Sequence, residues 1–328
     1  YAADERAHVE IGTVYPTNDT RAALMEVLLT IMRTGRENDT DAGARGVTAR
    51  ESDILSVAVR VLHDRHGDDP QPPVIADLRD LLREGPDEVR TAAVWDDPEN
   101  DELYRAQVRG LLADLHGFSN RMTKFGRLFG DQTTARIDLS RPVDFDISAL
   151  AQSGDDVVAA VLATTWTSAF AAKNAADVLA EEGLQPRRNH VIIMDEMHRA
   201  LRASPLMVEK LDLLTRLNRQ WGVGQIMITH TFKDLMCMET PAQNTKARGF
   251  VERSEIKVLG ALSRIEVDRY LRGECGLPVS RREEDMLEDW ATPVNFGSDA
   301  SHKGLGRFLI KLGGLPGIPI NVEMCPLE

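Results

Sequence analysis

The chain has 328 residues, of which 42% are hydrophobic and 28% are charged, and its formal net charge is -13. This content of hydrophobic residues is enough for one large domain or for two smaller ones. The acidic balance excludes a general electrostatic attraction to nucleic acid or to anionic lipid, and no apolar run approaches the roughly 20 residues needed to cross a bilayer.

The first predicted domain, residues 1–135, is expected to be a lobe of short helices. Apolar residues recur at helical spacing in several segments that are separated by polar stretches. These segments are 20–35, 48–66, 72–85 and 101–117. The second of them begins with a capping box formed by Thr48 and Glu51.

The second predicted domain, residues 136–328, begins where the pattern changes. The sequence RIDLSRPVDFDISAL, residues 136–150, has the alternation and the Pro and Asp punctuation of extended structure. A long alanine-rich helix follows and is expected to end at Gly183. The next elements are a strand at 190–194, a helix at 205–221 and a strand at 224–229. Strands that alternate with helical segments predict a parallel sheet with crossover helices, an α/β fold.

The last part of the chain is expected to continue with a strand, two helices and a closing hairpin. The strand lies at 255–262, and the helices at 263–273 and 280–290 each open with Ser-x-x-Glu. Two strands joined by a turn rich in glycine and proline are predicted within 306–324.

The segment HVIIMDEMHRA, residues 190–200, carries the strongest indication of chemistry. Its apolar run ends directly in Asp195 and Glu196, and ligands of open parallel sheets bind at the carboxyl ends of strands. In P-loop nucleotide hydrolases the first of two such acids holds Mg²⁺, usually through water, and the second activates the attacking water. We therefore predict these roles for Asp195 and Glu196. The alternative is a strand that simply ends in a polar loop.

The neighbouring segments supply further candidates. The strand at 224–229 ends at Thr229 and His230, whose side chains could reach a terminal phosphate or the attacking water. Arg216 and Arg219 lie in the last turns of the preceding helix, from which an arginine could reach the site of a neighbouring subunit in a ring. The alternative for both arginines is a solvated position on the helix surface.

A metal cluster is the competing interpretation of the same region. Its members would be His190, Asp195, Glu196, His198 and His230. Their spacing matches no recognised ligand pattern, and a strand points successive side chains to opposite faces. His198 is therefore interpreted as a polar residue of the loop that follows the strand.

Residues 195–235, DEMHRALRASPLMVEKLDLLTRLNRQWGVGQIMITHTFKDL, resemble the region around the Walker B motif of the ring-forming ATPases of the HerA/FtsK superfamily. They are most similar to the conjugation and type IV secretion ATPases of the fourth VirB component type. The resemblance implies a RecA-like P-loop NTPase core with an all-helical lobe, and ATP and Mg²⁺ as substrate and cofactor. It implies that Arg219, three residues before Gly222, is an arginine finger acting in trans. It also implies that His230 stands at the sensor position, where the family usually has glutamine.

The resemblance further implies a hexameric ring on the cytoplasmic face of the cell membrane, in contact with the membrane-channel components of a secretion system. Three cysteines far apart in the sequence suit a reducing cytosol. The cargo, DNA or protein, stays open. The alternatives are a DNA translocase or coupling ATPase of the same superfamily, and a non-hydrolysing scaffold.

One element of the family is missing from these residues. The sequence contains no Gly-x-x-x-x-Gly-Lys-Ser/Thr, the loop that binds the phosphates. In the family this loop lies upstream of the helical insertion, and the sequence starts at Tyr1 without methionine. We expect the loop to precede Tyr1 in a longer parent protein and these residues alone to bind nucleotide poorly. A degenerate relative without the loop is the other explanation.

Overall fold

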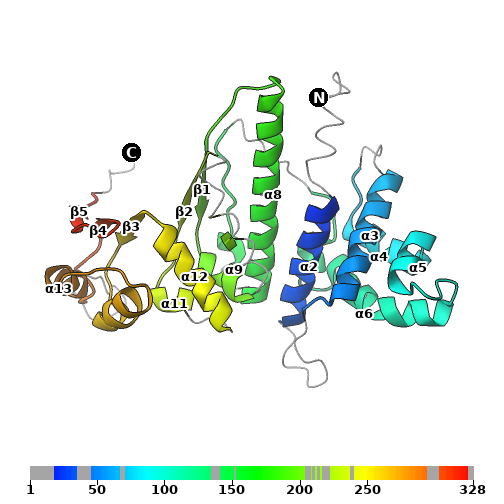
Figure 1. Cartoon of the computed structure of the whole chain (residues 1–328), viewed down its shortest axis with the longest axis horizontal. Helices are drawn as coiled ribbons and strands as arrows, with labels where there is room; N and C mark the ends of the chain where they lie inside the picture. Colours follow the sequence, from blue (N-terminus) through cyan, green and yellow to red (C-terminus); the bar gives the residue numbers. More distant parts are fainter. Residues whose placement is uncertain are drawn as a thin grey trace. The chain divides into compact units, whose positions relative to one another are not determined.

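The computed structural model describes most of the chain, which forms two compact units that divide between His190 and Val191. Figure 1 labels the helices and strands. The described residues are 18–34, 46–66, 71–133, 141–150, 153–203, 208, 211–212, 215, 222–236, 240–293 and 303–323. The division falls after the long helix rather than near the predicted boundary at residues 135 and 136, which stays a prediction. Each unit is described by itself.

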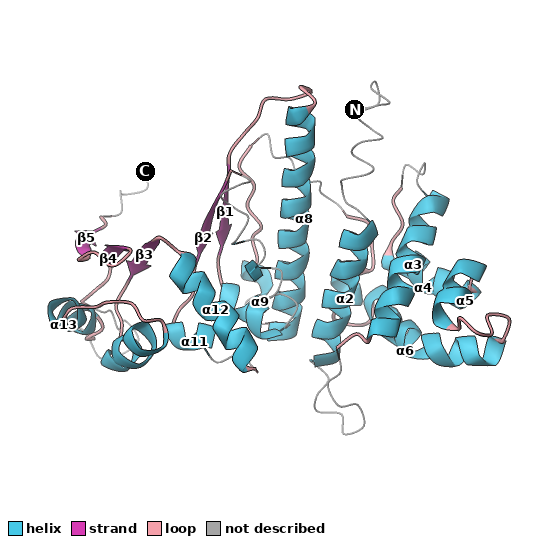
Figure 2. Cartoon of the chain, in the orientation of Figure 1, coloured by secondary structure: helices cyan, strands magenta, loops and turns pink. Residues whose placement is uncertain are grey.

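The regular elements in the described part of the first unit are helices, apart from its last residue, His190, which begins a strand (Figure 2). Its elements are α2 (Asn18–Thr34), α3 (Ala49–His66), α4 (Ile75–Glu84), α5 (Asp87–Ala93), α6 (Asp101–Ser119), α7 (Gly126–Phe129), the 3₁₀ turn η1 (Ser148–Leu150) and α8 (Asp155–Glu181). The predicted helices of the lobe are confirmed. So is the capping box of α3, in which the Glu51 backbone N–H donates to Thr48 Oγ1 over 3.3 Å and the Thr48 N–H donates to Glu51 Oε2 over 2.8 Å.

Apolar stripes hold these helices together. Helix α2 packs against α3 and α8, α3 against α5, and α4 against α6. Leu29, Leu55, Leu111 and Phe118 are completely buried between them. Arg33 ties three helices together, because its guanidinium lies 2.7 Å from the carboxylate of Glu51 and 2.8 Å from that of Asp114. The lobe therefore has its own hydrophobic core.

The extended segment expected at residues 136–150 forms no strand where the structure describes it. Residues 141–147 have no strand pairing and lead into η1, while 136–140 lie outside the described residues. Pro142 has no N–H to donate to a strand ladder. The Asp146 carboxylate instead accepts the backbone N–H of Ser148 over 2.8 Å, which makes a local turn. Val143 and Phe145 are left exposed.

The strands form two small sheets (Figure 1). β1 (His190–Met194) pairs with β2 (Val223–Met227), and a hydrogen bond of 2.9 Å from Ile228 N to Met194 O joins their carboxyl ends, so the two strands run parallel. β3 (Ile256–Leu259), β4 (Arg307–Leu312) and β5 (Ile318–Asn321) form an antiparallel sheet.

The expectation of one mostly parallel sheet is thus wrong for the described strands. A tight connection such as the one between β4 and β5 can join only antiparallel neighbours, since parallel strands need a long crossover. The closing hairpin itself is confirmed, and β3 aligns Val258 with Ile310 along it. A mixed fold of helices and small sheets is what the structure contains.

The remaining described helices of the second unit are α9 (Met197–Ala203), α11 (Phe232–Met236), α12 (Pro241–Arg253), the π-helix η2 (Glu266–Glu274) and α13 (Arg281–Trp290). In the predicted helix at 205–221, Val208, Leu211 and Asp212 are helical and buried. None of the described helices of the chain is both long and apolar enough to cross a membrane.

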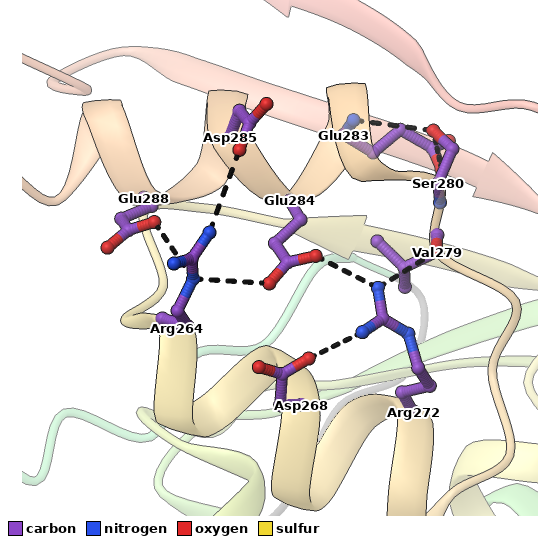
Figure 3. A network of polar contacts seen from close by, with 9 residues as sticks. All are labelled: Arg264, Asp268, Arg272, Val279, Ser280, Glu283, Glu284, Asp285 and Glu288. Carbon is purple, nitrogen blue, oxygen red and sulfur yellow. Dashed lines mark hydrogen bonds and ion pairs between the residues drawn. The ribbon is translucent and has the colours of Figure 1, made fainter.

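A hydrophobic cluster joins η2 and α13 to the antiparallel sheet. A polar layer of ion pairs and hydrogen bonds made by Arg264 and Arg272 links the η2 segment to α13. The cluster contains Leu259, Leu262, Val267, Leu271, Leu277, Val279, Leu287, Trp290 and Leu309. Figure 3 shows the polar layer, in which Arg272 of η2 reaches both the Glu284 carboxylate and the Val279 carbonyl, each over 3.1 Å. Arg264 lies 3.4 Å from the carboxylates of Glu284 and Glu288.

A buried ion pair anchors α13 to β4. Lys311 is 1% exposed, and its ammonium lies 2.8 Å from Glu283 Oε1, which also accepts the Gly317 N–H over 2.6 Å. Burial alone would raise the pKa of Glu283, but the hydrogen bonds from Lys311, Ser280 and Gly317 outweigh it and lower this pKa to about 2.

Candidate functional site

The two predicted acids lie in a tight turn at the carboxyl end of β1. Met194 is completely buried, and Asp195 and Glu196 form the turn that leads into α9. Glu196 has φ 51°, in the left-handed region that side chains other than glycine seldom adopt. Such a conformation costs on the order of 1–3 kcal/mol and persists where the surroundings hold it. The strand–turn–helix junction therefore fixes where the Glu196 side chain leaves the backbone.

The end of β2 meets this turn. Ile228 donates to the Met194 carbonyl over 2.9 Å, and Met197 donates back to the Ile228 carbonyl over 3.4 Å. These bonds bring Thr229 and His230 beside the acidic pair. The far end of the same loop is fixed by the Phe232 N–H, which donates to the Glu266 carboxylate of η2 over 3.1 Å.

His230 contacts Glu196 directly. Its Nε2 lies 2.8 Å from Glu196 Oε1, and its side chain is 71% exposed. Thr229 donates its hydroxyl to the Thr231 carbonyl over 3.3 Å. The structure thus brings together four residues that the sequence analysis selected, Asp195, Glu196, Thr229 and His230. Their chemical roles stay predictions.

His198 is the residue whose place the sequence analysis misjudged. It belongs to the first turn of α9 rather than to a loop, and its side chain is only 9% exposed. Its Nε2 lies 3.5 Å from Glu196 Oε2, and its ring packs edge-on against that of His230 with centroids 5.5 Å apart. The sequence offers the Glu-x-His spacing as a signal, but the contact depends on the turn at Glu196, which spacing does not reveal.

Asp195 has the properties of a ligand for a hydrated cation. Its side chain is exposed, and Oδ1 accepts the Glu196 N–H over 2.9 Å, which orients the carboxylate. Among the residues that the structure describes, no three His, Cys, Asp or Glu side chains are grouped to hold a metal ion. A single oriented carboxylate fits Mg²⁺, which proteins commonly bind through one or two carboxylates together with water and substrate phosphates.

The two predicted arginines, Arg216 and Arg219, lie outside the described residues. Gly222, which follows them, is described and has φ 62°, a conformation that favours glycine. Gly222, directly before β2, therefore has a structural reason to be glycine.

Comparison with known proteins finds similar solved structures but no similar sequence. No protein-family model matches the chain, and neither does any curated protein sequence. The structure of VirB4 of Thermoanaerobacter pseudethanolicus superposes with a TM-score of 0.60 at 17% sequence identity. The match covers 94% of this chain and 69% of that one. The chain therefore has a VirB4-like fold.

Proposed function

We propose that the chain is part of an ATP-hydrolysing motor subunit of a type IV secretion or conjugation system, with the hydrolytic site at the carboxyl ends of β1 and β2. The VirB4-like fold supports this proposal, as does the resemblance of residues 195–235 to the Walker B region of the conjugation ATPases. The observation that carries it is the contact of Glu196 with His230, from the loop after the neighbouring strand β2, at 2.8 Å.

In the proposed reaction Glu196 is the general base. Its carboxylate takes a proton from the water that attacks the terminal phosphate of ATP, a role that contributes on the order of 10²–10⁴ in rate. The side chain is partly buried, and its carboxylate contacts His230 at 2.8 Å, which points it towards the end of β2. His230 supplies a hydrogen-bond donor for the terminal phosphate or for the water, and Thr229 does so once its hydroxyl turns from the Thr231 carbonyl.

Asp195 would hold Mg²⁺, most simply through a coordinated water. The ion, when bound with ATP, neutralises the negative charge that develops on the phosphates. The contribution of this chain is an exposed carboxylate whose orientation is fixed by the Glu196 N–H.

The proposed ATPase needs two further parts outside this site, a phosphate-binding loop and an arginine from a neighbouring subunit. The phosphate-binding loop is absent from the 328 residues, so the proposal requires it from additional protein sequence. Arg219, with Arg216 nearby, acts on the site of the neighbouring subunit in a proposed hexameric ring. The ring works at the cytoplasmic face of the membrane, beneath the channel components.

The test is steady-state ATP hydrolysis by a protein that contains this chain together with its phosphate-binding loop. Glu196→Gln keeps the size of the side chain but removes the base, and is expected to lower kcat by about 10²- to 10⁴-fold. Glu252→Gln, at an exposed position of α12, is the matched control and should leave kcat unchanged. Unchanged turnover in Glu196→Gln would refute the assigned base.

The second candidate is a DNA-translocating ATPase of the same superfamily. It predicts turnover that rises with added DNA, and DNA binding that weakens steeply with salt. The net charge of -13 favours the first proposal over this one.

A further inference from the structure

Glu196 lies between two imidazoles that differ in their surroundings. His230 contacts Oε1 over 2.8 Å and is exposed, whereas His198 lies 3.5 Å from Oε2 and is buried. Each carboxylate oxygen thus has its own histidine. Neither the general-base role nor the sensor role explains the second histidine.

The buried histidine is fixed in place. It lies in the first turn of α9, where the Arg199 N–H donates to the Glu196 carbonyl over 2.9 Å and Met197 is tied to the β2 end. Met197 itself is 1% exposed. A side chain with this anchorage has little freedom to change rotamer, because the interior around it is closely packed.

The exposed histidine is free to exchange partners. His230 lies in the loop after β2, and its Nε2 can donate to one acceptor at a time. If it turns from Glu196 Oε1 to a phosphate, Oε1 loses its donor and becomes available to a water molecule. Glu196 then needs another contact to keep its direction.

We propose that His198 is a positioning residue for Glu196. Its Nε2–H holds Oε2, so that the carboxylate stays aimed at the attacking water when His230 turns to the terminal phosphate. The inference rests on the proposed function, which supplies the water and the phosphate. It assigns the two histidines different tasks, one fixed and one exchangeable.

The kinetic test compares His198→Phe with His198→Gln in the ATP-hydrolysing protein. Phenylalanine keeps a buried ring but has no donor, and kcat is expected to fall by about 10- to 100-fold, while the KM for ATP stays within about threefold. Glutamine restores an N–H donor and should recover part of kcat. A purely structural role of the ring predicts the opposite order, with phenylalanine better than glutamine.

A second measurement follows the contact without catalysis. In the nucleotide-free protein, the ring ¹⁵N resonances of His198 should shift when Glu196 is changed to Gln, and should stay in place in Glu252→Gln. This measurement tests the contact between His198 and Glu196 without any substitution of His198, so a poorly folded His198 variant does not affect it.

The outcomes separate the inference from the proposed function. Wild-type kcat in His198→Phe, together with an inactive Glu196→Gln, would overturn the positioning role and leave the general base intact. Normal turnover in Glu196→Gln would instead refute the proposed role of Glu196 in ATP hydrolysis, and the proposed function with it. Unchanged His198 resonances in Glu196→Gln would overturn the contact itself.

Discussion

At the scale of single residues, the sequence predicted the acidic pair and His230 at one sheet edge, but not the contact of His198 with Glu196. An apolar run that ends in Asp195 and Glu196 predicts a strand end with two carboxylates, and the structure confirms that position. The left-handed backbone of Glu196 and the burial of His198 depend on how β1 pairs with β2. That pairing joins residues more than thirty positions apart, which local spacing does not encode.

His230 stands where the family that the sequence resembles usually has glutamine, and substitution tests what this difference does. Because glutamine also carries an N–H donor, His230→Gln should retain at least roughly a tenth of the wild-type kcat for ATP hydrolysis, whereas His230→Ala should lose about 10²-fold. The measurement is steady-state turnover, with His116→Gln, an exposed histidine of α6, as the control. Equal turnover in the Gln and Ala variants would show that His230 donates nothing to the reaction.

The buried Glu283–Lys311 pair predicts a large loss of stability. Lys311→Met leaves a buried carboxylate without its cation and should lower the free energy of unfolding by roughly 3–5 kcal/mol. The exposed pair Lys303–Asp289, at 2.8 Å, is the control, and Lys303→Met should cost about 1 kcal/mol or less. Chemical denaturation measures both, and similar losses in the two variants would contradict the assignment.

The same pair has a defined pH dependence. The pKa of Glu283 is lowered from 4.5 to about 2 in the folded protein, so its contribution to stability is complete above the unfolded value and is lost as the pH falls towards 2. The difference in unfolding free energy between the wild type and Lys311→Met should therefore shrink from pH 5 to about pH 2. A difference that is constant over this range would show that the pair is not ionised in the folded state.

At the scale of elements, helices with strong periodicity were predictable and isolated extended segments were not. The end of α8 was correctly placed at Gly183, which has φ 72°. The strand expected in 136–150 failed because alternation describes a half-buried strand only when a neighbouring strand supplies hydrogen bonds. Pro142 and Asp146 favour a turn there instead.

The glycine at the end of helix α8 gives a prediction about stability. A Cβ at Gly183 would meet no atom within 4 Å, so the cost of Gly183→Ala comes from the left-handed backbone alone, about 1 kcal/mol of unfolding free energy. Gly46→Ala, which also meets no atom within 4 Å and has no positive φ, should cost nothing or slightly stabilise. Denaturation curves compare the two, and equal effects would rule out the backbone explanation.

At the scale of the whole molecule, the sequence predicted a helical lobe in residues 1–135 and an α/β part in 136–328, whereas the two units of the structure divide between His190 and Val191. The sequence did not predict that the described strands form a parallel pair and a separate antiparallel sheet. Strand order depends on pairings between distant segments, for which a single sequence gives no direct signal. The VirB4-like fold was anticipated only through the Walker B resemblance, and it extends over 94% of the chain.

The proposed function depends on Glu196 acting as the general base in the hydrolysis of ATP bound next to β1 and β2. A single-turnover experiment tests it most directly: limiting ATP with Mg²⁺ is added to the protein that carries the phosphate-binding loop, and ADP is quantified over time. Glu196→Gln is expected to bind ATP and to retain it unhydrolysed over a period in which the wild type and Glu252→Gln convert all of it to ADP. Conversion of bound ATP by Glu196→Gln at the wild-type rate would show that Glu196 is not the base.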